Sequence, residues 1–316
     1  MTRMRGEIRD DERSATPVQT TLLIAIVILV GLLVGAAVFD IGYLLGEPTT
    51  VPAGSGECSY TIDFDPRDVS GFAEDRAASQ RYVDGTFPCV LWFDASSSRS
   101  GEPGSSVRTW RDKSSNGFDA KPVGTAPRWA SVDGIEAVEF GREDNASLTV
   151  DATPADLNVS TDSGLTVTML VYVVDAEDRG GGLYSMGDPG GGPDGRAFEV
   201  RQSDVSTSDP AADEWWADPG PDAEITTDGE WAIVTHTTDG EEGTLYVNGE
   251  SVGTETGRAT ELGGEIRIGS VGPDSAFEGY VAEYFVTNER LGEASRNIVQ
   301  CAMAENHDDV VDLDVC

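Results

Sequence analysis

From Phe87 to near the C-terminus the sequence is a succession of short β-like runs, and few folds accommodate such a pattern. Runs of Val, Ile, Leu, Thr and aromatic residues are separated by turns rich in Gly, Asp, Pro and Ser. This alternation is typical of a β-sandwich or barrel, in which each strand crosses the core once before a turn reverses the chain. The expected strands are Val90–Phe93, Ala137–Phe140, Ser147–Val150, Leu165–Val174, Trp231–Thr237, Thr244–Val247, Glu250–Thr254, Glu265–Ser270 and Tyr280–Val286.

One hairpin and one helix can be placed within this pattern. Asn248-Gly249 lies between two β-like runs, and this dipeptide favours a two-residue hairpin turn because both turn positions need a positive φ. Near the C-terminus the apolar spacing changes to that of a helix, which predicts one short helix with an apolar stripe on the sandwich. The residues of that stripe are Leu291, Ala294, Ile298 and Ala302.

Three blocks of sequence follow one another across residues 87–306. They are LWFDA (91–95) with TWRDKSSNG (109–117), then EW (230–231) with LYVNG (245–249), and then IGS (268–270) with FEGYVAE (277–283). Together these blocks resemble the concanavalin A-like lectin/glucanase superfamily in its laminin G-like branch. The resemblance implies an all-β fold, a two-sheet antiparallel jelly roll, that binds ligands on its concave face or its rim loops. It implies no particular ligand, because one fold hosts many functions.

An uncharged stretch precedes this region. No charged residue occurs between Arg13 and Asp40, and Leu22–Phe39 is almost wholly apolar. Together with Ala15–Thr21 it is long enough to cross a bilayer core of about 30 Å. Its Leu, Ile, Val and Phe side chains favour insertion by about 4–8 kcal/mol. We therefore expect one transmembrane helix within residues 16–45.

The distribution of positive charge predicts how this helix is oriented. Four arginines precede it within residues 1–15, and the next basic residue is Arg67. Positive residues stay on the cytoplasmic side, so residues 1–15 are expected to be a cytoplasmic leader of a single-pass membrane protein whose C-terminal domain is extracellular. A cleaved secretory signal is the alternative, with Gly35-Ala36-Ala37 as a weak cleavage site, but the apolar segment exceeds the usual signal core of about 7–15 residues.

Ser14-Ala15-Thr16-Pro17-Val18 stands between the short Arg-containing leader and the apolar helix. This N-terminus resembles the signal and stalk of archaeal type IV pilins. The resemblance implies processing near Ala15–Thr16 and pilus subunits as partners of the helix. Two features depart from the pattern, because the stalk lacks an early acidic residue and the leader itself contains Glu7, Asp10, Asp11 and Glu12.

Residues 46–86 are expected to link the helix to the sandwich, beginning with the spacer-like sequence GEPTTVPAGSG at 46–56. The chain has four cysteines, and an even number in an exported chain indicates two disulfides with three pairings open. Local pairing is one alternative, and a long-range bridge from Cys89 to Cys301 is another, because sandwich termini often lie close together. The cysteines are Cys58, Cys89, Cys301 and Cys316. Residues 307–316 are expected to form an acidic tail.

The charge balance narrows the range of partners. The chain has 57 acidic and 21 basic residues, a net charge of -36. This excludes a generic nucleic-acid binder, which needs clustered Lys and Arg. Lys113 and Lys121 are the only lysines. Such self-repulsion is relieved by salt, so we expect a salt-adapted organism and, given the pilin-like N-terminus, a halophilic archaeon.

A catalytic pair of carboxylates is not evident in the sequence. Glycoside hydrolases of the resembled superfamily use two carboxylates on one strand, but the Glu-x-Asp-x-(x)-Glu run is absent. Glu136 and Glu139 are three residues apart and should point to opposite faces of a strand. His236 and His307 are the only histidines, and they are expected to be a satisfied strand residue and a solvated tail residue. The sequence predicts that the protein is not an enzyme, with a surface polysaccharide hydrolase as an alternative.

Two adjacent tryptophans are the candidate ligand-binding residues. Trp215 and Trp216 lie in the polar loop ADEWWADPG, and aromatic faces stack on sugar rings, whereas exposed neighbouring tryptophans are costly without a partner. The alternative is that one of them plugs the edge of the sandwich. The predicted function is a membrane-anchored cell-surface binding or adhesion module for glycan or a surface protein. A minor or tip pilin-like subunit is the second hypothesis.

Further candidate sites lie in the loops. The resemblance implies calcium on the rim, and Ca²⁺ takes about six to eight oxygens from loops. The candidate ligands are Asp188, Asp194, Asp218 and Asp222, in DPGGGPD and DPGPD, although acid-rich turns are equally a feature of salt-adapted proteins. Asn145-Ala146-Ser147 and Asn158-Val159-Ser160 are glycosylation sequons that suit an exported chain.

The charge analysis makes a testable prediction about folding. Because salt screens the repulsion between carboxylates, the thermal midpoint followed by circular dichroism should rise substantially between millimolar and molar salt. An unchanged midpoint would refute the salt adaptation.

Overall fold

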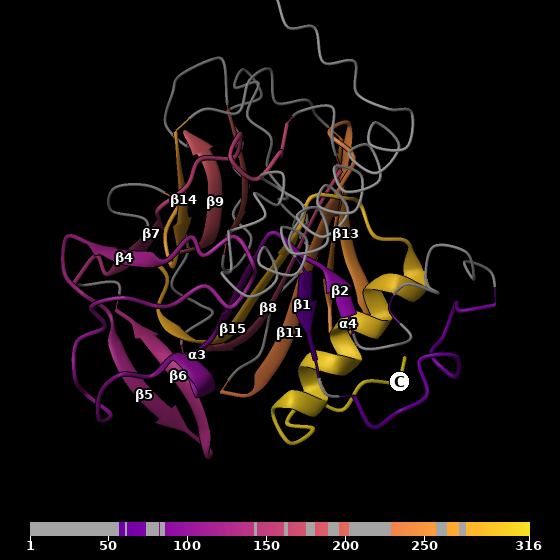
Figure 1. Ribbon diagram of the computed structural model, residues 1–316, viewed down its shortest axis with the longest axis horizontal. Helices are drawn as coiled ribbons and strands as arrows, with labels where there is room; N and C mark the ends of the chain where they lie inside the picture. Colours follow the sequence, from indigo (N-terminus) through magenta and orange to yellow (C-terminus); the bar gives the residue numbers. More distant parts are fainter. Residues whose placement is uncertain are drawn as a thin grey trace, which may run out of the picture. The chain divides into compact units, whose positions relative to one another are not determined.

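Two antiparallel sheets form the framework of the computed structural model (Figure 1). The structure describes residues 57–60, 62–73, 82, 86–141, 144–160, 164–174, 181–188, 196–201, 229–256, 264–271 and 276–316. All of them belong to one unit, Val51–Cys316. The expected leader and the expected transmembrane segment lie outside these residues. Within the described part of the chain, none of the helices is both long enough and apolar enough to cross a bilayer.

The larger sheet has eight strands in the order β13–β12–β11–β8–β15–β6–β5, with β3 also paired to β15. Strand β15 therefore pairs on one side with β8 and on the other with β6 and then β3. The bounds are β3 (Leu91–Asp94), β5 (Arg128–Val132), β6 (Ile135–Phe140), β8 (Leu165–Val173), β11 (Trp231–Thr238), β12 (Glu242–Val247), β13 (Glu250–Thr256) and β15 (Gly279–Thr287).

The smaller sheet has five strands in the order β10–β9–β14–β7–β4. Its strands are β4 (Ala120–Val123), β7 (Ser147–Val150), β9 (Gly182–Asp188), β10 (Arg196–Arg201) and β14 (Glu265–Ile268). A two-stranded ribbon of β1 (Glu57–Ser59) and β2 (Thr86–Pro88), a short helix α3 (Ala95–Ser98) and the C-terminal helix α4 (Glu293–Asn306) complete the described elements. The predicted antiparallel sandwich with a C-terminal helix is confirmed.

The strands that the sequence did not predict lie mostly at sheet edges. Strand β4 is an edge strand that contains Lys121 and Pro122, and it buries only one of its four residues fully. Edge strands keep polar residues and proline because one side of their backbone stays unpaired. Strand β9 is an internal strand that begins at Gly182, where an added Cβ would lie 2.2 Å from Val271 Cγ1.

The eight-stranded sheet is buried on both faces. One hydrophobic cluster fills the space between the two sheets, and a second lies between the eight-stranded sheet and α4. In β8, Val167 and Met169 belong to the first cluster and Leu170 belongs to the second. Burial of both faces explains why Leu165–Val173 is a nearly continuous apolar run instead of an alternating one.

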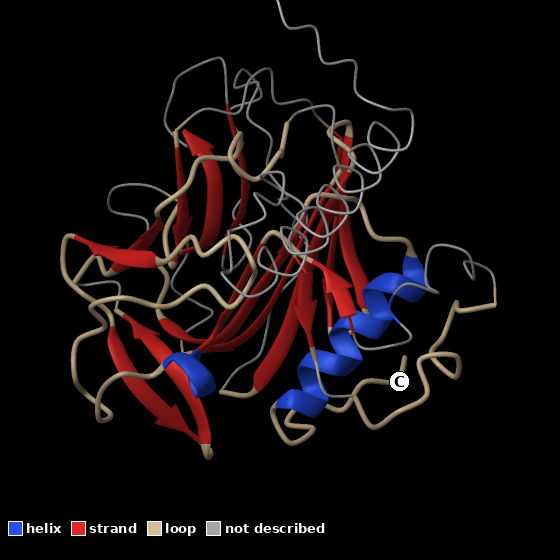
Figure 2. Ribbon diagram, in the orientation of Figure 1, coloured by secondary structure: helices blue, strands red, loops and turns tan. Residues whose placement is uncertain are grey.

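Helix α4 lies on the outer face of this sheet, with β1 and β2 beside it (Figure 2). Residues 294–304 are all buried, more than the one apolar stripe that the sequence predicted. The chain around Val69 and Phe72 and the C-terminal residues around Val311 and Leu313 pack in the same cluster as the helix. These contacts enclose α4 as part of a third layer.

The third layer includes residues that the sequence placed in a linker and in a C-terminal tail, so these two predictions are corrected. The sequence placed residues 46–86 in a linker, but residues 57–60 and 62–73 fold against α4 through contacts such as Asn297 Nδ2 donating to Ser70 O at 3.2 Å. The C-terminal residues are not a solvated tail either, since His307 is only 4% exposed. Both segments cover apolar residues of the helix. Their packing depends on tertiary contacts between distant parts of the chain, which local sequence does not reveal.

The four cysteines form two local disulfides. Cys58 pairs with Cys89 and Cys301 pairs with Cys316, so the alternative bridge between Cys89 and Cys301 is not formed. The first disulfide joins β1 to the end of β2, and the second ties the C-terminus to α4. Both therefore hold the outer layer together.

A β-bulge in β15 directs a carboxylate into this outer layer. The register with β8 shifts between Val281 and Glu283, leaving Ala282 as the extra residue. Alternation would otherwise place Val281 and Glu283 on the same face. Instead Val281 packs between the sheets, while Glu283 joins Phe285 on the side of α4.

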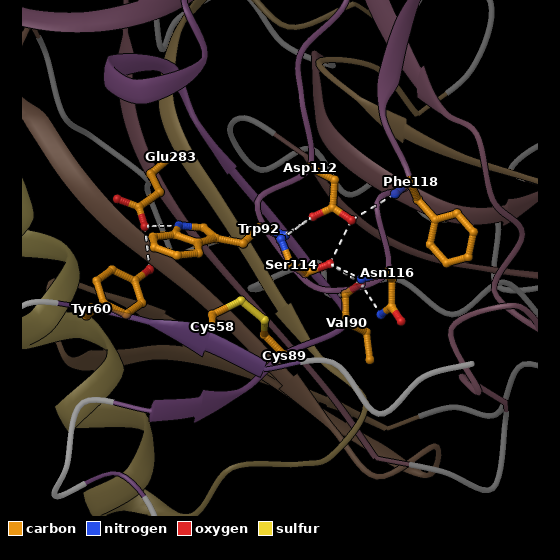
Figure 3. Close-up of a disulfide and its surroundings, with 10 residues drawn as sticks. All are labelled: Cys58, Tyr60, Cys89, Val90, Trp92, Asp112, Ser114, Asn116, Phe118 and Glu283. Atoms are coloured by element: carbon orange, nitrogen blue, oxygen red, sulfur yellow. Dashed lines mark hydrogen bonds between the residues drawn. A yellow bond between two sulfur atoms is a disulfide. The ribbon is translucent and has the colours of Figure 1, made fainter. Parts of the chain in front are cut away.

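Glu283 is fully buried and is held by four side chains from three segments, of which Tyr60 and Trp92 are drawn in Figure 3. Trp92 Nε1 lies 2.7 Å from Oε1, which also accepts from the Tyr60 hydroxyl. Asn306 Nδ2 at 3.1 Å and His307 Nε2 at 2.7 Å contact Oε2. Burial, together with the charge of Glu283, raises the pKa of Tyr60 well above its usual range. This carboxylate therefore connects the N-terminal segment, β3 and the end of α4 to the sheet.

This arrangement predicts a large cost for removing the carboxylate. Glu283→Ala would leave four polar groups without their common acceptor, and we expect it to lower the free energy of unfolding by about 3–5 kcal/mol. Chemical denaturation in high salt measures this loss. Glu250→Ala, at an exposed position of β13, is the control and should change it by less than about 0.5 kcal/mol. A similar effect of both variants would contradict the role of Glu283.

Candidate functional site

Most of the ligand-binding residues predicted from the sequence lie outside the described residues. These are Trp215, Trp216, Asp194, Asp218 and Asp222. Asp188 ends β9, but its side chain is not described. The tryptophan pair and the calcium loops therefore remain predictions. Among the residues that the structure does describe, no group of three or more His, Cys, Asp or Glu could hold a metal ion.

The two sequons both lie in turns. Asn145 follows β6 with φ 50°, and Asn158 follows a turn before β8 with φ 56°. Asparagine is one of the few residues that adopts a positive φ without much strain. Each asparagine thus has a local conformational reason to be present, and glycosylation of these positions remains a prediction.

The motif TWRDKSSNG organises a loop beside β3 (Figure 3). The carboxylate of Asp112 accepts from the backbone N–H groups of Trp92 at 3.0 Å, Ser114 at 2.9 Å and Phe118 at 2.9 Å, and from Ser114 Oγ at 2.7 Å. Asn116 Nδ2 donates to Val90 O at 3.0 Å. These polar side chains are engaged inside the protein, so the motif stabilises the fold and does not itself present a ligand site.

His236 lies between the two sheets, on the inner face of β11. Its Nδ1 bonds with the Tyr184 hydroxyl, and its side chain is 1% exposed. Burial, with a smaller contribution from Arg290, lowers the pKa of His236 to about 3. The prediction that His236 is a structural residue of a strand is confirmed, with Tyr184 as the partner of its Nδ1.

Glu136 and Glu139 lie on opposite faces of β6, as their spacing predicts. Glu136 forms an ion pair with Arg99. Glu139 stands directly opposite Tyr280 of β15, on the outer face. Two carboxylates separated by a sheet cannot act on one glycosidic bond, so this pair does not form a hydrolase site.

A row of aromatic residues crosses the outer face of the eight-stranded sheet. Trp231 of β11 stands opposite Tyr172 of β8, and Tyr172 stands opposite Tyr280 of β15. Directly opposed residues of antiparallel strands point to the same face. The rings confirm this, since the Tyr172 centroid lies 5.6 Å from that of Trp231 and 5.8 Å from that of Tyr280.

The row continues with polar residues toward the edge of the sheet. Tyr280 stands opposite Glu139 of β6, and Glu139 stands opposite Arg128 of the edge strand β5. Burial, followed by the charge of Glu139, raises the pKa of Tyr280. We call Trp231, Tyr172, Tyr280, Glu139 and Arg128 the aromatic row. Five strands spaced about 4.8 Å apart make it about 19 Å long.

The aromatic row borders the part of the outer face that α4 covers. Gln300 of α4 donates to Thr235 of β11 at 2.8 Å, four residues from Trp231. Tyr172 and Tyr280 are partly exposed at the margin of the cluster under the helix, whereas Trp231 is 6% exposed. The two tyrosine rings therefore combine a fixed position with access to solvent, and this is the candidate site among the described residues.

Sequence reasoning placed Trp231 and Tyr280 in strands but did not bring them together. Their strands are separated by about fifty residues in the chain, and the pairing register alone brings them into one row. The available signal was that both residues stand in blocks that resemble the superfamily. Tyr172 had no such signal, because it lies at the end of a long apolar run.

The comparison with protein families agrees with this architecture. Residues 143–295 match a family model described as the concanavalin A-like lectin/glucanases superfamily. The resemblance to that superfamily is confirmed. The matched range contains the second and third sequence blocks, while LWFDA and TWRDKSSNG lie before it. A search of curated proteins gives no match.

Several solved structures share part of this topology. Domain 4 of AbnA, a GH43 extracellular arabinanase from Geobacillus stearothermophilus in complex with arabinotriose, is 13% identical, with 63% of this chain and 100% of that chain covered and a TM-score of 0.44. The binding domain of Paraclostridial Mosquitocidal Protein 1 is 14% identical, with 66% and 51% covered and a TM-score of 0.42. Trypanosoma rangeli sialidase is 14% identical, with 69% and 33% covered and a TM-score of 0.42. This chain spans only about half and a third of the latter two, and at these scores none of the three bears on its function.

The buried histidine predicts an acid sensitivity. Folding lowers the pKa of His236 from 6.5 to about 3, so the stabilisation that depends on neutral His236 is complete above pH 6.5 and is lost as pH falls toward 3. The difference in unfolding free energy between the protein and His236→Gln should therefore shrink by about 1.4 kcal/mol per pH unit below 6.5. Urea unfolding at pH 7.5, 6 and 5 measures it, and a difference that does not vary with pH contradicts the burial of a neutral imidazole.

Proposed function

We propose that this protein is a membrane-anchored cell-surface module that binds glycans through the aromatic row. The partly exposed rings of Tyr172 and Tyr280, packed edge to face on a rigid sheet, carry this proposal. Aromatic faces stack on sugar rings, and rings locked by a sheet lose little entropy on binding. Glu139 next to Tyr280 supplies a hydrogen-bond acceptor for sugar hydroxyls.

Other parts of the proposal rest on the sequence. The apolar segment within residues 16–45 anchors the chain, and the sandwich is displayed outside the cell of a halophilic archaeon. Trp215 and Trp216 supply a second aromatic contact in a rim loop, with calcium bound by the neighbouring acidic loops. Asn145 and Asn158 carry glycans of their own.

The first test is a glycan array probed with the full chain in detergent and molar salt, with and without Ca²⁺. Tyr172→Leu and Tyr280→Leu should each weaken binding about five- to tenfold, because each removes one stacking ring. Tyr246→Leu is the matched control. Tyr246 is a partly exposed tyrosine on β12 that stacks under Arg296, away from the row. Equal losses in all three variants, or no glycan bound by the unaltered chain, would sink the proposal.

The double variant Trp215→Ala with Trp216→Ala is measured in the same assay. A loss of binding in this variant alone would move the site from the row to the rim loop.

A pilin-like role is the second candidate, favoured by the sequence Ser14–Val18 before the apolar helix. The mature N-terminus separates the two roles. Mass spectrometry of the purified protein should find an intact leader for a plain anchor, whereas a start at Thr16 would favour assembly into a filament.

A further inference from the structure

One segment of the sandwich has more basic than acidic residues. Residues 99–128 contain six basic and three acidic residues, although the whole chain has 21 and 57. Residues 104–107 of this segment run beside the edge strand β5, where Ser106 forms a bridge with Arg128 and Trp129 N–H donates to Ser105 O at 2.9 Å (Figure 1). This basic segment therefore meets the sandwich edge at which the aromatic row ends.

Half of these basic side chains have partners within the protein. The ion pairs are Arg99 with Glu136, Lys113 with Asp94 and Lys121 with Asp151. Arg108, Arg111 and Arg128 are exposed and form no ion pair with any other described residue. In a chain with such an excess of carboxylates, three exposed arginines of one segment that have no ion-pair partner indicate an anion that comes from outside the protein.

The register places one of these arginines on the aromatic row itself. Arg128 and Tyr280 share the outer face, separated only by Glu139. Two strand spacings set their backbones about 10 Å apart. Arg108 follows two residues after Ser106, which pairs with Arg128. A chain of sugars stacked along the tyrosines therefore reaches an unpaired guanidinium at the end of the row.

We propose that the ligand of the aromatic row is an acidic polysaccharide, whose carboxylate or sulfate groups bind Arg128 and Arg108 while its pyranose rings stack on Tyr172 and Tyr280. This inference rests on the proposed glycan binding and adds the chemical class of the ligand. A planar guanidinium donates two parallel hydrogen bonds to a carboxylate or a sulfate. Such direct contacts suit a salty medium, because molar salt screens charges beyond about 3 Å.

The test uses two matched pairs of polymers and the full chain in detergent at molar salt. Polygalacturonate is compared with its methyl ester, and dextran sulfate with dextran, so that only the anionic groups differ within each pair. We expect at least about tenfold tighter binding to one anionic member than to its neutral counterpart, from charge-assisted hydrogen bonds. The pair that shows the difference identifies carboxylate or sulfate as the recognised group.

Variants then locate the anion site. Arg128→Gln should remove most of the preference for the anionic polymer, and Arg128→Lys should restore little of it, because lysine cannot form the two parallel hydrogen bonds. Lys121→Gln is the control: it makes the same change of charge in the same segment, but Lys121 lies on β4 of the other sheet and pairs with Asp151. It should leave the preference unchanged.

The outcomes separate this inference from the proposed function. Equal binding of neutral and anionic polymers, still weakened by Tyr280→Leu, would overturn the acidic ligand and leave glycan binding intact. Equal losses in Arg128→Gln and Lys121→Gln would show a diffuse charge effect and overturn the assigned site. If single-stranded DNA bound as tightly as the preferred anionic polysaccharide, the proposed selection for polysaccharide would be overturned. Failure to bind any polymer or any array glycan would overturn both proposals.

Discussion

Burial of both faces of one sheet is the constraint on which the remaining structure depends. An ordinary antiparallel sheet can leave one face in water, but here the outer face carries apolar residues that need cover. Helix α4, residues 57–73 and the C-terminal residues provide that cover. The buried carboxylate of Glu283 adds a condition, because a charge removed from water must be fully hydrogen-bonded. The carboxylate of Glu283 has all four hydrogen-bond partners only when all of these segments are in place.

The same constraint determines where a ligand can bind. The third layer occupies the middle of the outer face, and the second sheet occupies the inner face. Among the described residues of the outer face, Tyr172 and Tyr280 are partly exposed at the margin of the cluster under the helix. The position of the candidate site thus depends on how far α4 extends. The tyrosine rings of the site are held in place because the sheet that carries them is packed on both sides.

The acidic composition affects the surface and the interior differently. Inside, Glu283 and Asp112 organise donors from several segments, and both stabilise the fold. On the described part of the surface, an excess of carboxylates leaves few basic residues without partners. The unpaired arginines of residues 99–128 are informative for this reason, whereas stray carboxylate pairs such as Glu136 and Glu139 are expected by number alone.

The sequence by itself determined the strand-rich fold, the terminal helix, the hairpin at Asn248-Gly249 and the superfamily resemblance, because these depend on periodicity, turn chemistry and local motifs. It also predicted that Glu136 and Glu139 would face apart and that His236 would be an ordinary strand residue. It missed most of the edge strands, because half-exposed strands carry little apolar signal. Only the tertiary structure decided that His307 is buried, that the cysteines pair locally, and that Trp231, Tyr172, Tyr280, Glu139 and Arg128 form one row. These outcomes depend on register and layer packing, which join residues far apart in the chain and leave no trace in any short stretch of sequence.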